Sequence, residues 1–315
     1  MEFKSIEDTI EKMKQNDYIS SQEIATVVFL AGVTGKPLLI EGPPGVGKTE
    51  LAKTVARALG RELIRLQCYE GIDEGKAIYE WEYAKQLLYT QMLKEKIHDI
   101  VDAEDSLTAA VKKIAAQENA FFSDHFIQAR PLLKAITSPE PVVLLIDEVD
   151  KSDPEFEALL LELLSDYQIS IPELGTIRAR HIPFVILTSN SSREMSDTLK
   201  RRCLYLYIDF PSPERERDIV MLKYPGIDER FANKIVAAVT DIRSLDLKKK
   251  PCISETLDWT HTLLALESTE IPLDLIIRTL SVLCKHRADL ERVKEHLLTK
   301  EGAPGGHREK TNAPH

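Results

Sequence analysis

Residues 42–49 have the types and spacing of a phosphate-binding loop. They read Gly-Pro-Pro-Gly-Val-Gly-Lys-Thr, which completes the pattern G-x-x-x-x-G-K-T. An apolar run precedes the loop and a segment of helical spacing follows it, so backbone N–H groups and a helix N-terminus would surround a phosphate chain. Lys48 would place its charge on the β- and γ-phosphates, and the Thr49 hydroxyl would bind Mg²⁺. The loop predicts ATP and Mg²⁺ as cofactors, with contacts from Gly42, Pro43, Pro44, Gly45, Val46, Gly47, Lys48, Thr49 and Glu50.

Two adjacent carboxylates follow a second apolar run. Residues 142–146 are uninterrupted aliphatic residues, which is typical of a strand buried on both faces of a parallel sheet. Asp147 and Glu148 come directly after it, at the carboxyl end of the strand, where open α/β sheets bind ligands. Asp147 would hold Mg²⁺ through its water shell, and Glu148 would polarise the attacking water. Alone, the pair would be solvated acids at a strand end; beside a phosphate-binding loop it indicates hydrolysis.

Two further polar positions could complete the chemistry. Asn190 ends the apolar run 184–188, and its amide can both donate and accept a hydrogen bond, so it could position the water or contact the γ-phosphate. Arg201 and Arg202 precede another apolar run, and a guanidinium beside the γ-phosphate can change the rate by about 10³–10⁵-fold. We favour Arg202 over Arg201 for this role; the alternative is that both complement the dipole of a helix end.

The elements that must position these residues form an α/β pattern. A helix is predicted over 5–16, and a second begins near Ser20, where a capping-box pattern precedes an apolar run. A hairpin is predicted over 167–180, and Asp153 is expected to cap the helix that follows the acidic pair. The predicted buried strands are 37–40, 63–68, 142–146, 184–188 and 204–208.

The strand pattern stops at Phe210-Pro-Ser-Pro213, and the chain beyond it reads as helices only. We therefore predict an α/β core over 1–211 and an all-helical domain over 212–297. A helical insertion is expected at about 74–125, because that stretch is long for a simple crossover, and a flexible tail over 298–315.

Composition excludes several classes of protein. Lys and Arg total 41 against 51 Asp and Glu, a formal charge of −10, which argues against general nucleic-acid binding. The four cysteines lie far apart without metal-ligand spacing, as expected in a reduced compartment. The N-terminus is polar and no apolar run has the length of a membrane span, so we predict a cytoplasmic protein.

Together these motifs resemble those of the AAA+ ATPases, and within them the MoxR family. The narrower match is to the branch that includes CoxD, an assembly factor for carbon monoxide dehydrogenase. It is carried by DEVD (147–150), the hairpin SDYQISIPELG (165–175) and LKRRCLYLYIDFP (199–211), with RLQCYEGID and ETLDW in support. The resemblance covers roughly residues 5–297.

The resemblance implies an α/β ATPase core with a pre-sensor β-hairpin, followed by a helical lid, with nucleotide between them. It also implies assembly into a ring, commonly hexameric. Members are thought to act as chaperones for metal-cofactor insertion or complex assembly, often with a partner that bears a von Willebrand factor A domain. It assigns nucleotide and Mg²⁺ to Lys48 and Thr49, metal and water to Asp147 and Glu148, the sensor role to Asn190 and the finger acting on a neighbouring subunit to Arg202.

One position departs from the family pattern. AAA+ lids often supply an arginine near the start of a lid helix, but Ser254 stands where we would look for it and is interpreted as a helix cap. Whether Arg243 or one of the lysines 248–250 replaces that arginine is left open. Tyr18 and Ile19 are candidates to flank the adenine.

Substrate contact is a further open question. An aromatic cluster after the second strand either contacts substrate in the ring channel or packs an insertion onto the core; its members are Tyr69, Tyr79, Trp81 and Tyr83.

Three functions fit these patterns. The leading one is an oligomeric ATPase whose hydrolysis moves the lid and hairpin and so remodels or matures a partner protein. The second is a nucleotide-gated binding module in which slow hydrolysis only times the release of a partner. The third is a kinase that transfers phosphate to a small molecule; the hairpin, sensor and lid pattern argues against it.

Overall fold

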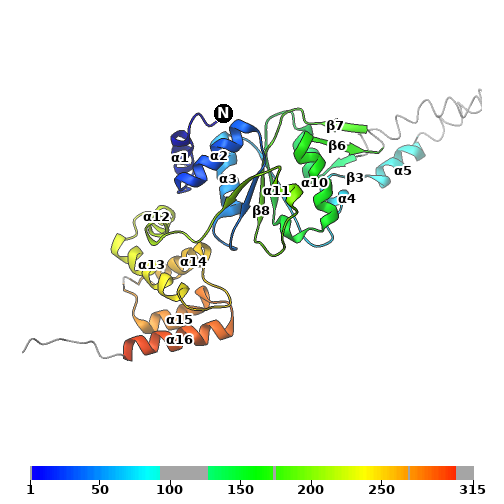
Figure 1. Ribbon diagram of the computed structural model, residues 1–315. Coiled ribbons are helices and arrows are strands. Elements are labelled where there is room, and N and C mark those ends of the chain that lie inside the picture. The colour runs from blue at the N-terminus through cyan, green and yellow to red at the C-terminus, as the bar shows by residue number, and fades with distance from the viewer. Residues whose placement is uncertain (1, 93–126, 173–174, 269, 303–315) are drawn as a thin grey trace, which may run out of the picture. The chain divides into compact units, whose positions relative to one another are not determined.

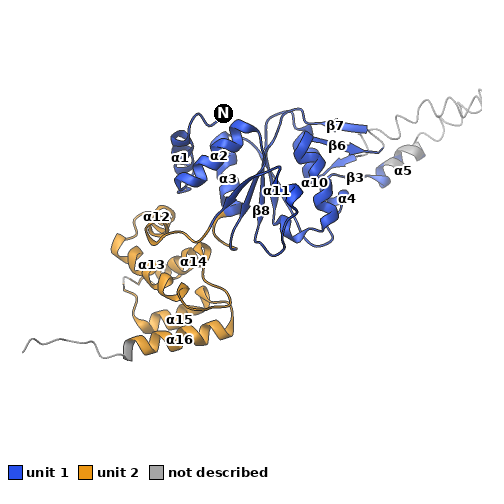
Figure 2. Cartoon of the chain, viewed as in Figure 1, with its two compact units in different colours: residues 1–43, 48–208 blue, residues 44–47, 209–315 orange. Residues whose placement is uncertain are grey.

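The computed structural model describes residues 2–172, except for 93–126, and residues 175–302, except for 269. The chain divides into two compact units (Figure 2). Unit 1 comprises residues 1–43 and 48–208, and unit 2 comprises residues 44–47 and 209–315. The core predicted from the sequence ended at 211, and the tail was expected from 298, whereas the last described helix continues to Gly302.

Unit 1 is built around a parallel sheet, as the sequence predicts (Figure 1). Five strands form it among the described residues, in the order β2-β5-β8-β1-β9, and all four neighbouring pairs are parallel. The interior strands β1, β5 and β8 are buried at every position, which explains their uninterrupted apolar sequence. The strands are β1 (Leu38–Glu41), β2 (Leu63–Gln67), β5 (Val143–Asp147), β8 (Phe184–Ser189) and β9 (Leu204–Tyr207).

The strand register aligns the ends that carry the polar residues. Gln67 pairs with Asp147 across β2 and β5, and Glu41 pairs with Ser189 across β1 and β8. Because the strands are parallel, the loop after β1, the acids at the end of β5 and Asn190 after β8 emerge at one edge of the sheet. We call this the carboxyl edge.

Helices cover both faces of the sheet (Figure 1). α2 contacts β1 and β9, and α3, which begins at Lys48, contacts β5 and β8. On the other face, α9 packs on β2 and β5, and apolar residues of α10 join alternate residues of the interior strands in one core. The helices of unit 1 are α1 (Ile6–Gln15), α2 (Gln22–Thr34), α3 (Lys48–Leu59), α4 (Glu74–Ala77), α5 (Tyr83–Met92), α9 (Pro131–Thr137), the 3-10 turn η2 (Val149–Lys151), α10 (Pro154–Asp166) and α11 (Asp197–Lys200).

Two small antiparallel pairs complete unit 1. The predicted hairpin is present as β6 (Gln168–Ile171) and β7 (Gly175–Arg178). The segment predicted as a helical insertion contains strand as well, because β3 (Tyr79–Trp81) pairs with β4 (Ile127–Ala129). The rest of that insertion, 93–126, lies outside the described residues.

Two predicted helix starts lie where the sequence placed them, and the structure gives the details of their caps. The helix predicted to begin near Ser20 is capped by Ser21, whose hydroxyl accepts a hydrogen bond from the N–H of Ile24. Asp153 stands at the N-cap of α10, but its side chain makes no capping hydrogen bond. Pro154 occupies the first turn of α10, where its missing N–H costs nothing.

Unit 2 contains helices only, apart from loops, among its described residues. Its core surrounds the fully buried Trp259, whose indole N–H donates to the Thr279 hydroxyl at 2.8 Å. A buried ion pair between Arg243 and Glu216 joins two of its helices at 2.9 Å. These helices are α12 (Pro213–Lys223), α13 (Glu229–Arg243), α14 (Ile253–Ala265), α15 (Leu273–Leu283) and α16 (Arg287–Gly302). Among the helices described in either unit, no segment is long and apolar enough to cross a membrane.

Candidate active site

The phosphate-binding loop begins with a glycine that no other residue can replace without strain. Gly42 has φ +151°, and a Cβ at this position would lie 2.0 Å from the carbonyl oxygen of Ile208. Gly45 and Gly47 also adopt positive φ, at 80° and 98°. These conformations are the ones for which glycine carries no Cβ penalty. The sequence pattern is therefore matched by a backbone that requires it.

Lys48 is held at the carboxyl edge by three acceptors. Its ammonium group donates to the carbonyl oxygens of Gly42 at 2.7 Å and Pro43 at 2.8 Å. It also donates to Oδ1 of Asn190 at 2.8 Å. The residue is only 6% exposed, so its charge faces the loop and not bulk solvent. A buried ammonium at this place is the point charge that a phosphate chain would meet.

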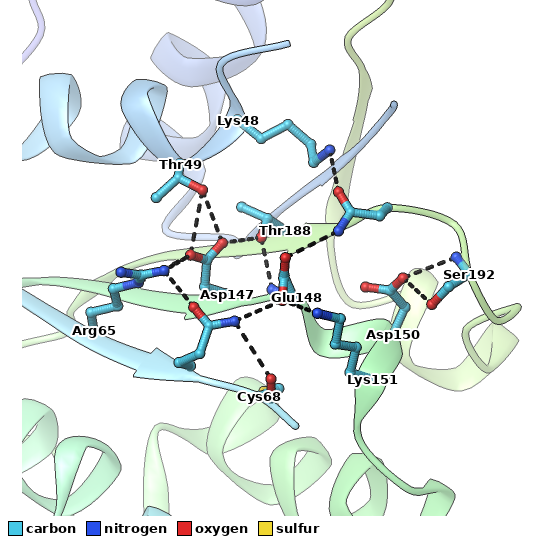
Figure 3. Close-up of polar contacts among 12 residues, drawn as sticks. Lys48, Thr49, Arg65, Cys68, Asp147, Glu148, Asp150, Lys151, Thr188 and Ser192 are labelled. Carbon is cyan, nitrogen blue, oxygen red and sulfur yellow. Dashed lines mark hydrogen bonds and ion pairs between the residues drawn. The ribbon is translucent and has the colours of Figure 1, made fainter. Parts of the chain in front are cut away.

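Asp147 lies directly beside Thr49. The Thr49 hydroxyl is 3.1 Å from Oδ1 of Asp147, and Thr188 donates its hydroxyl to the same oxygen at 2.5 Å. Arg65 donates to Oδ2 from Nε at 3.0 Å and also from Nη2 (Figure 3). The carboxylate is almost fully buried, so these donors replace its hydration.

A hydroxyl and a carboxylate at this spacing fit Mg²⁺. Mg²⁺ prefers hard oxygen ligands and usually takes one or two from protein, the rest from phosphates and water. No cluster of three His, Cys, Asp or Glu side chains that could hold a metal alone occurs in the described part of the chain. Thr49 and Asp147 are thus the residues that would hold the ion, in the company of a bound nucleotide.

Glu148 is fixed by its backbone and by three side chains. Its backbone is left-handed, with φ 56° and ψ 48°, and its N–H donates to the Thr188 hydroxyl at 2.9 Å. Oε2 accepts from Gln67 at 2.9 Å and from Lys151 at 2.6 Å, and the ion pair raises the pKa of the Lys151 ammonium. Non-glycine residues in this conformation cost of order 1–3 kcal/mol and cluster at functional sites.

Asn190 connects the loop to the acidic pair. Its Oδ1 accepts from Lys48, and its Nδ2 donates to Oε1 of Glu148 at 3.3 Å. One amide thus touches both the phosphate-side cation and the candidate base. Predicted residues that follow β1, β5 and β8 in the sequence are brought together here, as the contact between Thr49 and Asp147 shows (Figure 3).

Four residues at this edge were not predicted from the sequence. Arg65 and Gln67 come from β2, Lys151 from η2 and Thr188 from β8. The available signal was the alternation of β2, in which polar residues at 65 and 67 interrupt buried Ile64 and Leu66 and share one face. That signal does not say which strand lies next to β2.

Nearby buried groups do not add a nucleophile. Burial, with the charge of Asp147 next, raises the pKa of the Cys68 thiol to about 12, which keeps it protonated. Burial also raises the pKa of Asp150, but hydrogen bonds from the Ser192 hydroxyl and N–H more than offset it and hold the pKa below its usual value. Asp150 therefore stays ionised and ties the turn after β5 to the loop after Asn190.

The two candidate finger arginines lie at the opposite edge of the sheet. They precede the amino end of β9, which is parallel to β1, so they cannot share an edge with Gly42. Arg202 donates to the Ser165 hydroxyl at 2.5 Å and to the Thr198 carbonyl oxygen at 2.9 Å. Arg201 is exposed, and its guanidinium has no hydrogen-bond or ion-pair partner within the described segments.

Both arginines line a cleft of about 390 Å³ within unit 1. Lys36 adds a third positive charge, and Tyr167 forms one wall, its hydroxyl donating to the Gly35 carbonyl oxygen. Burial raises the pKa of Tyr167 to about 12, so it remains a neutral donor. We call these residues the amino-edge cleft.

Three other predicted contacts lie near α3. Tyr18 is buried and Ile19 partly buried, in the segment between α1 and α2. Arg57 of α3 donates to the carbonyl oxygen of Asn16, so this segment lies against the helix that follows the loop. Glu50 forms an ion pair with Arg57 at 2.8 Å, which directs its carboxylate along the helix surface.

The aromatic cluster divides between packing and exposure. Tyr79 and Trp81 meet edge to face, with ring centroids 6.3 Å apart, and Tyr79 packs on the core of unit 1. Tyr69 and Tyr83 are 44% and 71% exposed. Only these last two have the exposure that a substrate contact would need.

Within unit 2, Ser254 is not the helix cap that the sequence suggested. Cys252 occupies the N-cap of α14, and Glu255 closes a capping box by accepting from the Cys252 N–H at 3.1 Å. Ser254 lies in the first turn. Arg243 is committed to its ion pair with Glu216, and Lys249 pairs with Glu255 at 3.3 Å. Arg243 and Lys249 are therefore both paired within unit 2, and neither is an unpaired cation that could replace the lid arginine.

Comparison with known proteins places this geometry in a family. A sequence model described as AAA domain (dynein-related subfamily) matches residues 37–203. The chain belongs to this AAA domain family. The matched region of the AAA domain contains the loop, the acidic pair, Asn190 and both arginines.

Curated relatives of the AAA domain are distant. Lon protease 1 of Bacillus subtilis is 29% identical over 38% of this chain, which spans 17% of that relative's length. The gas vesicle ATPase GvpN of Haloferax mediterranei is 27% identical over 66% of the chain and 57% of the relative. An uncharacterised protein of Staphylococcus haemolyticus is 24% identical over 84% of the chain and 91% of the relative.

Among solved structures, the Thermotoga maritima RuvB Holliday junction branch migration motor is 19% identical, covering 89% of this chain and 72% of that one, with a TM-score of 0.45. A variant of the same protein gives a TM-score of 0.46 at 19% identity, over 90% of this chain and 74% of that one. We draw no argument from likenesses at this level.

Proposed function

We propose that this AAA domain protein binds Mg·ATP at the carboxyl edge and hydrolyses it to ADP and phosphate. One observation carries the proposal: Lys48, Asn190 and Glu148 form a continuous chain of polar contacts, and Thr49 touches Asp147 beside it. This arrangement has a phosphate cation, a metal-binding pair and a candidate base, as a phosphoryl-transfer site requires.

Each residue has a distinct part in the proposed reaction. Lys48 neutralises charge on the β- and γ-phosphates, and Asn190, which touches both Lys48 and Glu148, orients the attacking water. Glu148 accepts the proton of that water. Its carboxylate also accepts a hydrogen bond from the Asn190 amide, so the base and the residue that orients the water are in contact. Mg²⁺, held by Thr49 and Asp147, would supply charge neutralisation for the phosphates.

The proposal includes assembly into a ring, for which six subunits is the expected number. Arg201 and Arg202 lie at the edge of the sheet opposite Lys48, so either of them would reach a γ-phosphate only on a neighbouring copy. Arg202 must first release Ser165 and Thr198, whereas Arg201 has no such bonds to break in the described chain. The preference for Arg202 stays a prediction, with Arg201 as its rival.

The finer proposal concerns the purpose of hydrolysis. We infer a chaperone-like role in the cytoplasm, in which hydrolysis drives the maturation of a partner protein or metalloenzyme. A second protein, which bears a von Willebrand factor A domain, would assist in that process. The support is the MoxR-like sequence segments, foremost the hairpin β6–β7, which forms a two-stranded sheet of its own.

A second function is favoured by the state of Glu148. Gln67 and Lys151 both donate to Oε2 of its carboxylate, so that oxygen must give up a hydrogen bond before it can accept a proton from water. The alternative is therefore a nucleotide-gated binding module in which slow hydrolysis times the release of a partner. Hydrolysis rates with and without the partner separate the two functions.

The proposal is tested by phosphate release from ATP with Glu148→Gln. We expect the variant to bind a fluorescent ATP analogue as wild type does, while hydrolysis falls by about 10²–10⁴-fold. Glu155→Gln, on the exposed start of α10, is the matched control and should hydrolyse ATP at the wild-type rate. Equal rates in all three proteins would sink the assignment, and a phosphorylated acceptor in place of free phosphate would indicate a kinase.

A further inference from the structure

The Arg65 guanidinium forms an ion pair with the buried carboxylate of Asp147. Its side chain is 47% exposed, whereas that of Asp147 is 3% exposed. A buried carboxylate is stable only with a positive partner or several donors, and here the chain supplies the cation itself. Arg65 was not part of the sequence-based site, and the proposed hydrolysis does not use it.

The bonds around Asp147 leave little capacity for a second cation. Oδ1 accepts from the hydroxyls of Thr49 and Thr188. Oδ2 accepts both N–H groups of the Arg65 fork, from Nε at 3.0 Å and from Nη2. A magnesium ion, or a water of its shell, needs a lone pair of this carboxylate, and its charge repels a guanidinium at contact distance. The two cations therefore compete for one carboxylate.

Gln67 anchors the other side of the guanidinium. Nη2 of Arg65 also donates to Oε1 of Gln67, so the amide carbonyl faces Arg65 and the amide NH₂ faces Glu148. The chain of contacts Asp147–Arg65–Gln67–Glu148 runs across β2 and β5. Departure of Arg65 from Asp147 would remove the donor to the Gln67 carbonyl oxygen and leave the hydrogen bond from Gln67 to Glu148 in place.

We propose that Arg65 is a resident counter-cation of Asp147, anchored by Gln67, and that Mg²⁺ must displace it to bind. This inference rests on the proposed function, because it takes the carboxyl edge as the Mg·nucleotide site. The exposed half of Arg65 gives the guanidinium a route to solvent, where it is rehydrated without loss of a buried partner. When Mg²⁺ arrives with the nucleotide, its charge takes the place of the Arg65 guanidinium beside the buried Asp147 carboxylate.

The experiment is a titration of the ADP-loaded full-length protein with Mn²⁺, followed by the electron paramagnetic resonance of free Mn²⁺. In Arg65→Gln the competing charge is gone, so we expect Mn²⁺ to bind about 3–10-fold more tightly than in wild type. Arg65→Lys keeps a charge but loses the fork, and should give a smaller increase in the same direction. Arg61→Gln, which removes a charge just before β2 without contact to Asp147, should match wild type.

A purely structural role predicts the opposite sign. If Arg65 served to hold Asp147 in place for the metal, Arg65→Gln and Arg65→Lys would bind Mn²⁺ more weakly, and either that result or unchanged affinity overturns the inference. Gln67→Ala should tighten Mn²⁺ binding in wild type and have no effect in Arg65→Gln. Independent effects of the two substitutions would remove Gln67 from the proposal.

The same titration separates this inference from the proposed function. A protein in which neither ADP nor Mn²⁺ binds, in wild type and in every variant, contradicts the nucleotide site itself. Binding of both that is insensitive to Arg65 contradicts the counter-cation alone. In hydrolysis assays the Mg²⁺ concentration for half-maximal rate should fall in Arg65→Gln.

Discussion

The two edges of the parallel sheet differ in how completely their polar residues are satisfied. At the carboxyl edge, Lys48, Asp147 and Glu148 each have several partners from other strands. At the amino-edge cleft, Arg201 has no partner in the described chain and Arg202 reaches only a hydroxyl and a carbonyl. The first edge is the proposed nucleotide site, whereas the second presents Arg201 to solvent and is the edge that the proposed assembly would bring to a neighbouring copy.

Lys48→Ala should have the largest effect on nucleotide binding, because it removes the only side-chain cation that the predicted loop provides. We expect affinity for a fluorescent ATP analogue to fall by about 100-fold or more, since one charge-assisted phosphate contact and its buried position are both lost. Lys53→Ala, an exposed lysine of the same helix, is the control and should bind as wild type does. Unchanged affinity for the ATP analogue in Lys48→Ala would contradict the assignment of the carboxyl edge as the nucleotide site.

Substitution of the arginines should separate the edges. Arg202→Ala is expected to bind ATP normally and to lose about 10³-fold in hydrolysis by the assembled protein, because the charge acts on a neighbour's phosphates. Arg201→Ala decides which arginine acts, and Arg178→Ala, on exposed β7, is the matched control. Full hydrolysis by a dilute monomer, indifferent to both arginines, would show that the amino edge has no part in the reaction.

Gln67→Ala should have a moderate effect at the carboxyl edge. The substitution removes a donor that holds Oε2 of Glu148 at 2.9 Å, so the base gains freedom and basal hydrolysis should rise by roughly two- to fivefold. Steady-state phosphate release at saturating Mg²⁺ measures it. A fall in rate would mean that Gln67 positions Glu148 productively and does not restrain it.

Ser165→Ala should give the smallest effect. It removes the hydroxyl that accepts from Nε of Arg202, an exposed bond whose loss costs under about 1 kcal/mol of unfolding free energy. Hydrolysis by the assembled protein should rise by less than about threefold if Arg202 must detach before it acts. Thermal unfolding checks that stability is retained, and an identical rate favours Arg201 as the acting residue.

Local pattern was sufficient for most of the carboxyl edge. Gly42, Lys48 and Thr49 belong to one contiguous motif. Asp147 and Glu148 follow an uninterrupted aliphatic run, which indicates a strand buried on both faces. Parallel strands expose their carboxyl ends together, so Asn190 could be placed with them before any coordinates. The strands of the sheet were predicted for the same reason.

Other features depend on contacts between distant segments. Arg65 and Asp147 are 82 residues apart, and Gln67 and Glu148 are 81 apart, so their pairing follows from the adjacency of β2 and β5. The cap of α14 was assigned to Ser254 by residue preference, but Cys252 takes it because Glu255 lies in the right turn to close the box. Residues 79–81 form a strand because β4 is there to pair with them.

By itself, the sequence determined the phosphate-binding loop, the acidic pair and the buried strands that carry them, because these depend on residue types within a few positions of one another. Only the tertiary structure decided the order of those strands, and with it the cation that Asp147 holds and the donors that restrain Glu148. The physical reason is that hydrogen bonds between strands are set by spatial neighbours, and periodicity along a chain does not specify which strand lies beside which.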